Sequence, residues 1–241
     1  MSFQRLEQKA RYRLAVLASG TGSNLQAIID KLHRQPAYVP LRTNGQIQAG
    51  ARVGPEIDVA LVVSDRPDAP ALERAQKAGI PTAVFPFTPG LSREEHDKDM
   101  AEHIWAAGAD LVVLAGYMRL VSPWFVEAFP WKIINLHPAL LPAFPGTSSI
   151  KDALAYGVKV TGVTVHFVDA GLDTGPIILQ EPVRVREGDT LESLALRIHA
   201  VEHQLLPAAI CLLAMGRVTP PLPGGRMVRV DWDSDSNWSG E

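Results

Sequence analysis

Four short apolar runs, separated by amphipathic stretches, constrain the fold of this chain more than any other feature. The runs lie at residues 13–18, 57–64, 111–115 and 132–136. None of them shows the polar alternation of a strand with one wet face, so they suit a parallel sheet that is covered on both faces. Helical spacing between them occurs at residues 24–33, 69–79 and 92–108, and a weak strand at 82–87. The pattern predicts a doubly wound α/β fold with a mostly parallel sheet and helices on both faces.

The pattern changes beyond Gly157. Residues 159–168 alternate polar and apolar side chains, as expected of a strand with one wetter face. A further strand is expected over 175–185 and a long helix over 190–216. The C-terminal part is therefore predicted to add an antiparallel strand and a long helix to the sheet.

Two segments fit this plan poorly. Residues 35–56 form a polar connection with Gly and Pro that is unusually long for a loop in a compact domain, so we expect a surface excursion. The end of the chain, residues 231–241, is acidic and rich in Ser, Asn and Gly, and is expected to fray. No convincing linker interrupts the sequence, which predicts a single domain over 1–241 with its core at about 13–218.

Composition narrows the class of partner. The formal net charge is −3 at pH 7 and Lys and Arg form no cluster, which argues against nucleic acid. No apolar run approaches the roughly 20 residues that span a bilayer, and the first residues lack the apolar core of a secretory signal. We therefore expect a cytoplasmic protein without a membrane partner. The oligomeric state stays open, with a homodimer as one alternative, because apolar helix faces serve cores and interfaces alike.

The turn after the first apolar run has the composition of an anion site. Gly20, Gly22, Ser23 and Asn24 lie between this strand and the following helix. Glycine lets the backbone approach a ligand closely, and a helix N-terminus offers unpaired N–H groups. The same residues also suit an ordinary capped turn. The Walker sequence is absent, and the dinucleotide fingerprint is incomplete because Leu25 replaces its third glycine, so a small phosphorylated ligand fits better.

Asn135 and His137 stand at the end of the run 132–136, where ligands bind in open α/β sheets. Their two-residue spacing points both side chains to one side of a strand. An amide N–H can stabilise an oxyanion, and an imidazole can move protons near neutral pH. Asp173, in a Gly-rich loop, is the best candidate to hold the histidine, since a nearby carboxylate favours the protonated ring. A hydrogen-bonded structural His137 and a turn-forming Asp173 are the alternatives.

Other chemistries lack their motifs. His96 and His103 lie on one helix face, but a zinc site needs three or four ligands and no third one is apparent. The Gly-x-Ser-x-Gly elbow of serine hydrolases does not occur. Asn135, His137 and Asp173 therefore favour the transfer of a chemical group without a metal.

Five segments, in this order, closely resemble the phosphoribosylglycinamide formyltransferase family. They are LASGTGSNLQAIID, LVVLAGYMRLVSPWFV, INLHPALLPAFPG, GVTVHFVDAGLDTGPII and HAVEHQLLP, and the resemblance runs from about Arg13 to Val218. It implies a Rossmann-like formyltransferase fold. It also implies an enzyme of purine biosynthesis that transfers a formyl group from the cosubstrate 10-formyltetrahydrofolate to the amine of 5'-phosphoribosylglycinamide, without a metal.

The resemblance also implies roles for individual residues. Asn135 would bind the formyl oxygen, His137 would act as the general acid, and Asp173 would hold it. The phosphoribosylglycinamide would be bound by Gly22, Ser23, Asn24, His199 and Glu202. The formyl donor would be bound by Arg93, Met118, Arg119, Leu120, Val121, Asn135, Val168, Asp169, Ala170, Gly171 and Leu172.

The chain departs from the family in places. His199 stands where many relatives carry glutamine, which leaves its substrate contact open, and the loop sequence GTSSI lacks the histidine of some members. Methionyl-tRNA formyltransferase would need a further domain beyond Val218, and formyltetrahydrofolate hydrolase an N-terminal regulatory domain. Three alternatives stay open: the hydrolase, a non-catalytic nucleotide-binding module and a nicotinamide-dependent oxidoreductase. The binding module and the oxidoreductase both leave Asn135, His137 and Asp173 without a role.

Overall fold

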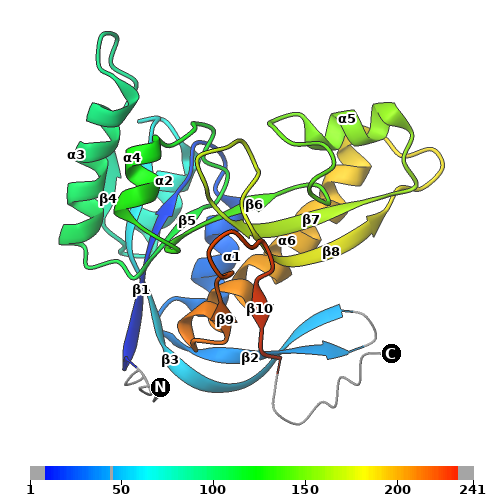
Figure 1. Cartoon of the computed structure of the whole chain (residues 1–241), viewed down its shortest axis with the longest axis horizontal. Helices are drawn as coiled ribbons and strands as arrows, with labels where there is room; N and C mark the ends of the chain where they lie inside the picture. The colour runs from blue at the N-terminus through cyan, green and yellow to red at the C-terminus, as the bar shows by residue number, and fades with distance from the viewer. Residues whose placement is uncertain (1–8, 44–45, 233–241) are drawn as a thin grey trace.

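The protein is represented by a computed structural model that describes residues 9–43 and 46–232. Its centre is an eight-stranded sheet in the order β2-β3-β1-β5-β6-β7-β8, with β4 paired to β3 (Figure 1). The strands are β1 (Arg11–Leu17), β2 (Gln35–Thr43), β3 (Gln46–Ser64), β4 (Thr82–Val84), β5 (Leu111–Leu114), β6 (Ile133–His137), β7 (Val160–Phe167) and β8 (Ile177–Arg184). The strands β4, β3, β1, β5 and β6 run parallel, and β7 and β8 continue the sheet antiparallel. The predicted fold class is confirmed.

Helices cover both faces of this sheet. They are α1 (Ser23–Leu32), α2 (Pro70–Lys77), α3 (Arg93–Ala106), α4 (Pro123–Ala128), α5 (Ser149–Tyr156) and α6 (Leu191–Ala214). Strand β1 divides its side chains between two apolar cores: Leu14 and Val16 pack in the core with α1, α2 and α6, whereas Ala15 and Leu17 pack in the core with α3 and α4. This division explains why the run 13–18 carries no polar alternation, since neither face of the strand meets water.

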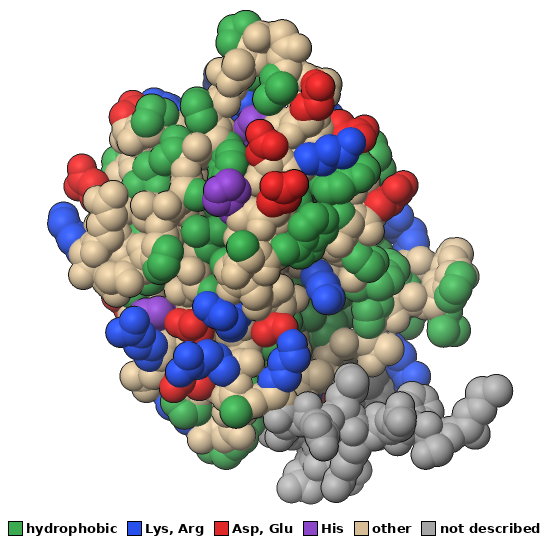
Figure 2. Space-filling view, turned by 90° about the vertical axis from the view of Figure 1, so that its left-hand side faces the viewer, with side chains coloured by type: hydrophobic (Ala, Val, Ile, Leu, Met, Phe, Trp, Pro, Cys, Tyr) green, Lys and Arg blue, Asp and Glu red, His purple; other side chains and the backbone are tan. Residues whose placement is uncertain are grey.

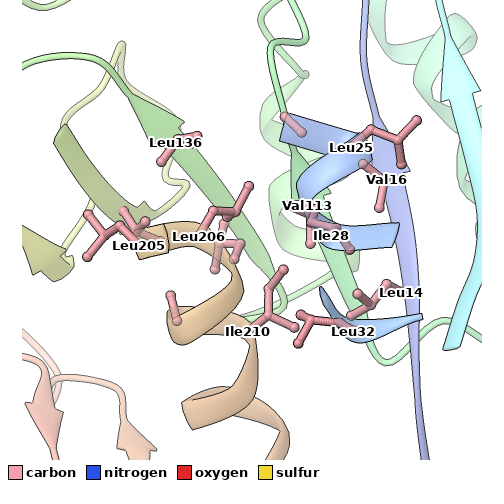
Figure 3. Packing of buried hydrophobic residues seen from close by; sticks show 14 of the residues in the cluster. Leu14, Val16, Leu25, Ile28, Leu32, Val113, Leu136, Leu205, Leu206 and Ile210 are labelled. Atoms are coloured by element: carbon pink, nitrogen blue, oxygen red, sulfur yellow. The ribbon is translucent and has the colours of Figure 1, made fainter. Parts of the chain in front are cut away.

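The larger core is built on α6. Ile210 of this helix points toward Leu32 of α1 and Leu14 of β1, and Leu205 and Leu206 pack in the same core (Figure 3). All five are fully buried. A buried leucine or isoleucine stabilises a fold by about 1.5–3 kcal/mol relative to an exposed one, so this contact ties the last helix to the first strand–helix unit.

The segment 35–56 is more regular than the irregular surface connection that its composition suggests. It forms β2 and the first half of β3, paired antiparallel from Gln35 opposite Ile57 to Thr43 opposite Gln46. Residues 46–64 thus form a single strand that includes the predicted run 57–64. Tertiary burial decides this, because Ala37, Tyr38, Val39 and Ile47 are all buried and both β2 and β3 contact α6. The prolines of β2 are tolerated because β2 is an edge strand.

Smaller differences occur elsewhere. The helices α4 and α5 are absent from the sequence-based expectation, and the strand expected over 82–87 is only Thr82–Val84. A two-stranded sheet of β9 (Val218–Thr219) and β10 (Arg229–Val230) follows α6. Of the segment 231–241, predicted to fray, residues 233–241 lie outside the described residues.

The surface agrees with the mixed charge of the sequence. Figure 2 shows the side on which α3 and α4 lie in Figure 1; acidic and basic side chains are interspersed there, with no large patch of one sign. Among the described residues, no helix combines the length and the apolar character that crossing a bilayer requires.

Candidate active site

Asn135 and His137 lie at the carboxyl end of β6, as their positions in the sequence predict. Both face the same side of the strand because one residue separates them. Strand β7 runs alongside, with His166 opposite Asn135 and Thr164 opposite His137. Asn135 is partly buried, whereas His137 is only 3% exposed.

The carboxylate of Asp173 connects the polar groups of this site. Its Oδ1 accepts a hydrogen bond from Asn135 Nδ2 at 3.2 Å, and its Oδ2 accepts one from the Gly146 backbone N–H at 2.8 Å. The same Oδ2 lies 3.4 Å from Nδ1 of His137. Asp173 adopts a left-handed backbone conformation with φ 53°, which Asp tolerates better than most residues. The structure therefore brings together Asn135, His137 and Asp173.

The ring of His137 lies between two oxygen acceptors. Nδ1 faces the Asp173 carboxylate, and Nε2 lies 2.8 Å from the carbonyl oxygen of Phe144. A proton on either ring nitrogen therefore has an oxygen atom nearby. The Pro-rich loop that supplies the Phe144 carbonyl is held by Thr164, whose hydroxyl donates to the Ala139 carbonyl at 2.7 Å.

His166 is a member of the site that the sequence-based prediction missed. Its Nε2 lies 3.2 Å from Asn135 Nδ2, and its Nδ1 lies 2.8 Å from the carbonyl oxygen of Phe167. Burial lowers the pKa of His166, so the ring is neutral near pH 7. Nδ1 then donates to Phe167 and Nε2 accepts from Asn135, which fixes the orientation of the Asn135 amide. The alternating pattern of residues 159–168 is the signal that places His166 on one face with its neighbours.

A pocket of about 470 Å³ opens beside these polar groups. Asn135, His137, His166 and Asp173 line one part of it. The eleven residues predicted to bind the formyl donor all line this pocket: Arg93, Met118, Arg119, Leu120, Val121, Asn135, Val168, Asp169, Ala170, Gly171 and Leu172. Met118, Leu120 and Leu172 are each about half exposed or more, so the pocket presents apolar surface to a ligand.

The residues predicted to bind the phosphorylated substrate form a second group. Gly22 precedes α1, and Ser23 and Asn24 begin it. Glu202 of α6 is buried, and its Oε2 accepts hydrogen bonds from Asn24 Nδ2 at 3.0 Å and from His199 Nδ1 at 2.8 Å. The hydrogen bond to Glu202 raises the pKa of His199. All five predicted residues thus lie around the junction of α1 and α6.

Hydrogen bonds between the turns that follow β1 and β5 connect these two groups of residues. Ser19 donates its backbone N–H to the carbonyl of Gly116 at 3.0 Å, and its hydroxyl accepts from the Met118 N–H at 2.9 Å. Gly116 and Met118 line the pocket, whereas Ser19 precedes the glycine turn. In the part of the chain that the structure describes, no three His, Cys, Asp or Glu side chains are arranged to hold a metal ion.

Comparison with known proteins agrees with this arrangement. Residues 12–210 match the Formyl transferase family. The phosphoribosylglycinamide formyltransferase of Mycobacterium tuberculosis (strain ATCC 25618 / H37Rv) is 43% identical over 215 residues, which are 89% of this chain and 91% of that protein. That of Bacillus subtilis (strain 168) is 40% identical over 198 residues, 82% and 92% of the two chains. The chain is also 42% identical to the trifunctional purine biosynthetic protein adenosine-3 of Drosophila melanogaster, of which it spans only 15%.

A solved structure is similar over nearly the whole chain. The glycinamide ribonucleotide transformylase 1 of Symbiobacterium toebii superposes with a TM-score of 0.79 and 45% sequence identity, covering 95% of this chain and 99% of that one. A family match over residues 12–210 includes the eight-stranded sheet from Tyr12 onward, the glycine turn, the pocket and the Asn135, His137 and Asp173 set. This chain belongs to the formyl transferase family.

Proposed function

We propose that this protein transfers a formyl group from 10-formyltetrahydrofolate to the amine of 5'-phosphoribosylglycinamide. The products are formylglycinamide ribonucleotide and tetrahydrofolate, an exchange that belongs to purine biosynthesis. The network of Asn135, His137 and Asp173 at the wall of a ligand-sized pocket carries the proposal. The names of the similar proteins from Mycobacterium tuberculosis and Bacillus subtilis support it.

The pocket suits a folate-type formyl donor. Its volume of about 470 Å³ lies in the range of small-molecule sites, and its walls combine apolar side chains with a few polar groups. Met118, Leu120 and Val121 offer apolar contacts to a fused ring, and Arg93 offers a positive charge to an acidic tail. When bound there, the donor supplies an activated formyl carbon. The residues of this chain bind and orient the two substrates and supply the proton.

The glycine turn suits the phosphate of the other substrate. Gly22 is followed directly by the N-terminus of α1, where no side chain caps the helix. The first N–H groups of a helix have no intrahelical partners and favour an anion. Glu202 and His199 lie beside this helix end and can meet the sugar or the amine.

Asn135 and His137 divide the chemical work. Asn135 Nδ2 donates to the formyl oxygen as negative charge develops on it, a contact worth about 2.7–4 kcal/mol in comparable enzymes. Of its two present acceptors, Asp173 Oδ1 lies 3.2 Å away, at the long end of the hydrogen-bond range, so one N–H can exchange this carboxylate for the formyl oxygen while the other stays on His166 Nε2. His137 gives the leaving nitrogen a proton from Nδ1, beside Asp173, as the bond from that nitrogen to the formyl carbon breaks. The proton that the attacking amine loses as its own bond forms restores the ring, and such transfer contributes about 10²- to 10⁴-fold in rate.

The test follows the absorbance of the folate as its formyl group is lost. Purified protein is mixed with 10-formyltetrahydrofolate, with and without 5'-phosphoribosylglycinamide. Loss of the formyl group only when the amine is present, with formylglycinamide ribonucleotide as the product, is the expected result. Equal loss without the amine would show a hydrolase instead. No loss in either case, beside an active control formyltransferase, would refute the enzymatic proposal.

Besides the roles of the site residues, four expectations from the sequence stay predictions. They are the single domain over 1–241, the cytoplasmic location, the homodimer as one alternative for the assembly, and the independence of the reaction from metal.

A further inference from the structure

We propose that Arg74 of α2 is a positioning residue for phosphate binding. It holds the turn of Gly20, Thr21 and Gly22 so that the backbone N–H groups of this turn face the phosphate of the substrate. The inference rests on the proposed function, because that function places the phosphate at Gly22, Ser23 and Asn24. Arg74 itself lies behind the turn and makes no contact with the phosphate in this scheme.

Helix α2 binds the carbonyl side of the turn. The Ala71 backbone N–H donates to the carbonyl of Gly20 at 3.2 Å, and Nε of Arg74 donates to the carbonyl of Thr21 at 2.8 Å. In a trans peptide the carbonyl and the following N–H point in opposite directions. The N–H groups of Thr21 and Gly22 are therefore directed away from α2. Within the described residues no oxygen accepts a hydrogen bond from either group.

These two donors are continuous with the helix end. The N–H groups of Ser23, Asn24 and Leu25 belong to the first turn of α1 and have no intrahelical acceptor. Together with Thr21 and Gly22 they form a run of successive backbone donors, an arrangement that binds anions. The direction of the first two donors depends on the hydrogen bonds that α2 makes to the carbonyl groups behind them.

Close packing holds the turn against α2 as well. Gly22 is buried and left-handed, with φ 71°. A Cβ atom on it would lie 2.8 Å from Cα and Cβ of Ala71 and 3.3 Å from Cδ of Arg74. The aliphatic part of Arg74 therefore covers the turn while its guanidinium reaches the Thr21 carbonyl.

The same guanidinium joins the turn to α1. Nη1 of Arg74 donates to Oε1 of Gln26 at 3.1 Å, and Nε2 of Gln26 donates to Oδ1 of Asp30 at 2.8 Å. A guanidinium can hold two acceptors in a fixed geometry, which a lysine ammonium on a flexible stem does less well. Arg74 thus links the turn to the first residues of the helix whose N–H groups complete the donor run.

The first experiment compares steady-state kinetics of Arg74→Met, Arg74→Lys and Lys77→Met with those of the unchanged enzyme. Losing a hydrogen bond from a charged donor weakens an interaction by a factor of roughly ten or more in its equilibrium constant. Arg74→Met is therefore expected to raise the KM for phosphoribosylglycinamide by about that factor. Its kcat and its KM for the formyl donor stay close to those of the unchanged enzyme. Arg74→Lys, which keeps the charge and one donor, is expected to recover part of the loss.

Lys77→Met is the matched control, because Lys77 is an exposed cation on the same helix, 81% accessible, outside the contacts of the turn. It is expected to leave all three constants unchanged. An equal rise in KM with Lys77→Met would overturn the proposal, since general positive charge would then explain the effect. An unchanged KM in Arg74→Met, or equal losses for both substrates, would also overturn it.

A second measurement separates this inference from the proposed function. Binding of inorganic phosphate to the unchanged protein and to Arg74→Met is measured by calorimetry, without the formyl donor. Weaker phosphate binding in Arg74→Met supports the positioning role even if the protein transfers no formyl group. Equal phosphate binding in the two proteins, beside full formyl transfer by the unchanged enzyme, would refute the role of Arg74 and leave the proposed function intact.

Discussion

The amide nitrogen of Asn135 lies 3.2 Å from Oδ1 of Asp173, although the two residues are 38 positions apart in the chain. The other oxygen of the same carboxylate faces the Gly146 N–H and the ring of His137. One side chain on a loop between β7 and β8 therefore sets the positions of two groups at the end of β6. The site depends on the sheet that brings these strands together.

Asp173→Asn is expected to lower kcat by about 10²-fold or more, because the neutral amide no longer offers a carboxylate oxygen to Nδ1 of His137, the proposed proton donor. Asn tolerates the left-handed backbone conformation of this position, so the loop is expected to keep its shape. Steady-state kinetics and thermal unfolding of the variant test this. Asp68→Asn, which changes an exposed carboxylate outside the site, is the control. A kcat equal to that of the unchanged enzyme would contradict the role of Asp173.

His137→Asn is expected to reduce kcat by about 10²- to 10⁴-fold while both substrates still bind, because it removes the proton donor and little of the pocket wall. Stopped-assay kinetics measure the rate, and calorimetry measures the dissociation constants of the two substrates. Normal turnover in this variant would exclude His137 from the chemical step. Loss of substrate binding would show that the ring acts mainly by shaping the pocket.

His166→Leu removes the acceptor that orients the amide of Asn135. The loss of one such hydrogen bond is worth about 1 kcal/mol, so kcat is expected to fall about fivefold. His166→Gln places a polar acceptor near the position of Nε2 and is expected to retain more activity than His166→Leu. Equal rates in these two variants would show that the volume of the ring, and not its acceptor, is what the site requires.

His33 gives a prediction about stability and pH. Its Nδ1 accepts a hydrogen bond from the Val59 backbone N–H at 3.1 Å, which requires an unprotonated nitrogen. Burial lowers the pKa of His33 below the usual value of 6.5; Arg34 acts in the same direction, and Asp58 opposes it. Because the unfolded chain binds the proton more readily, the contribution of His33 to stability is present above pH 6.5 and is lost as the pH falls below it.

The variant His33→Asn keeps an acceptor near the Nδ1 position and removes the titration. Urea unfolding of both proteins between pH 5 and pH 8 is the measurement. The free energy of unfolding is expected to fall less steeply with acid in His33→Asn than in the unchanged protein. The same slope in both would contradict the role assigned to His33.

Much of the fold can be predicted from the sequence because it depends on local patterns. The runs 13–18, 111–115 and 132–136 are apolar on both faces, and only a sheet covered by helices on both sides can bury such strands. The segment 35–56 shows the limit of this reasoning. Its polar residues suggest a loop, whereas antiparallel pairing of β2 with β3 and burial of Tyr38 and Ile47 make its described residues strands of the sheet.

The candidate site, too, has one part that a local sequence pattern predicts and another that it does not. The two-residue spacing of Asn135 and His137 on an expected strand was enough to place them together, since strand geometry is local. The sequence by itself therefore determined the parallel core, the glycine turn and this pair. Only the tertiary structure decided that Asp173 meets both side chains, that His166 orients Asn135, and that Arg74 supports the glycine turn. These contacts join residues far apart in the chain, and their distances depend on strand pairing and helix packing. No local sequence pattern predicts that pairing and packing.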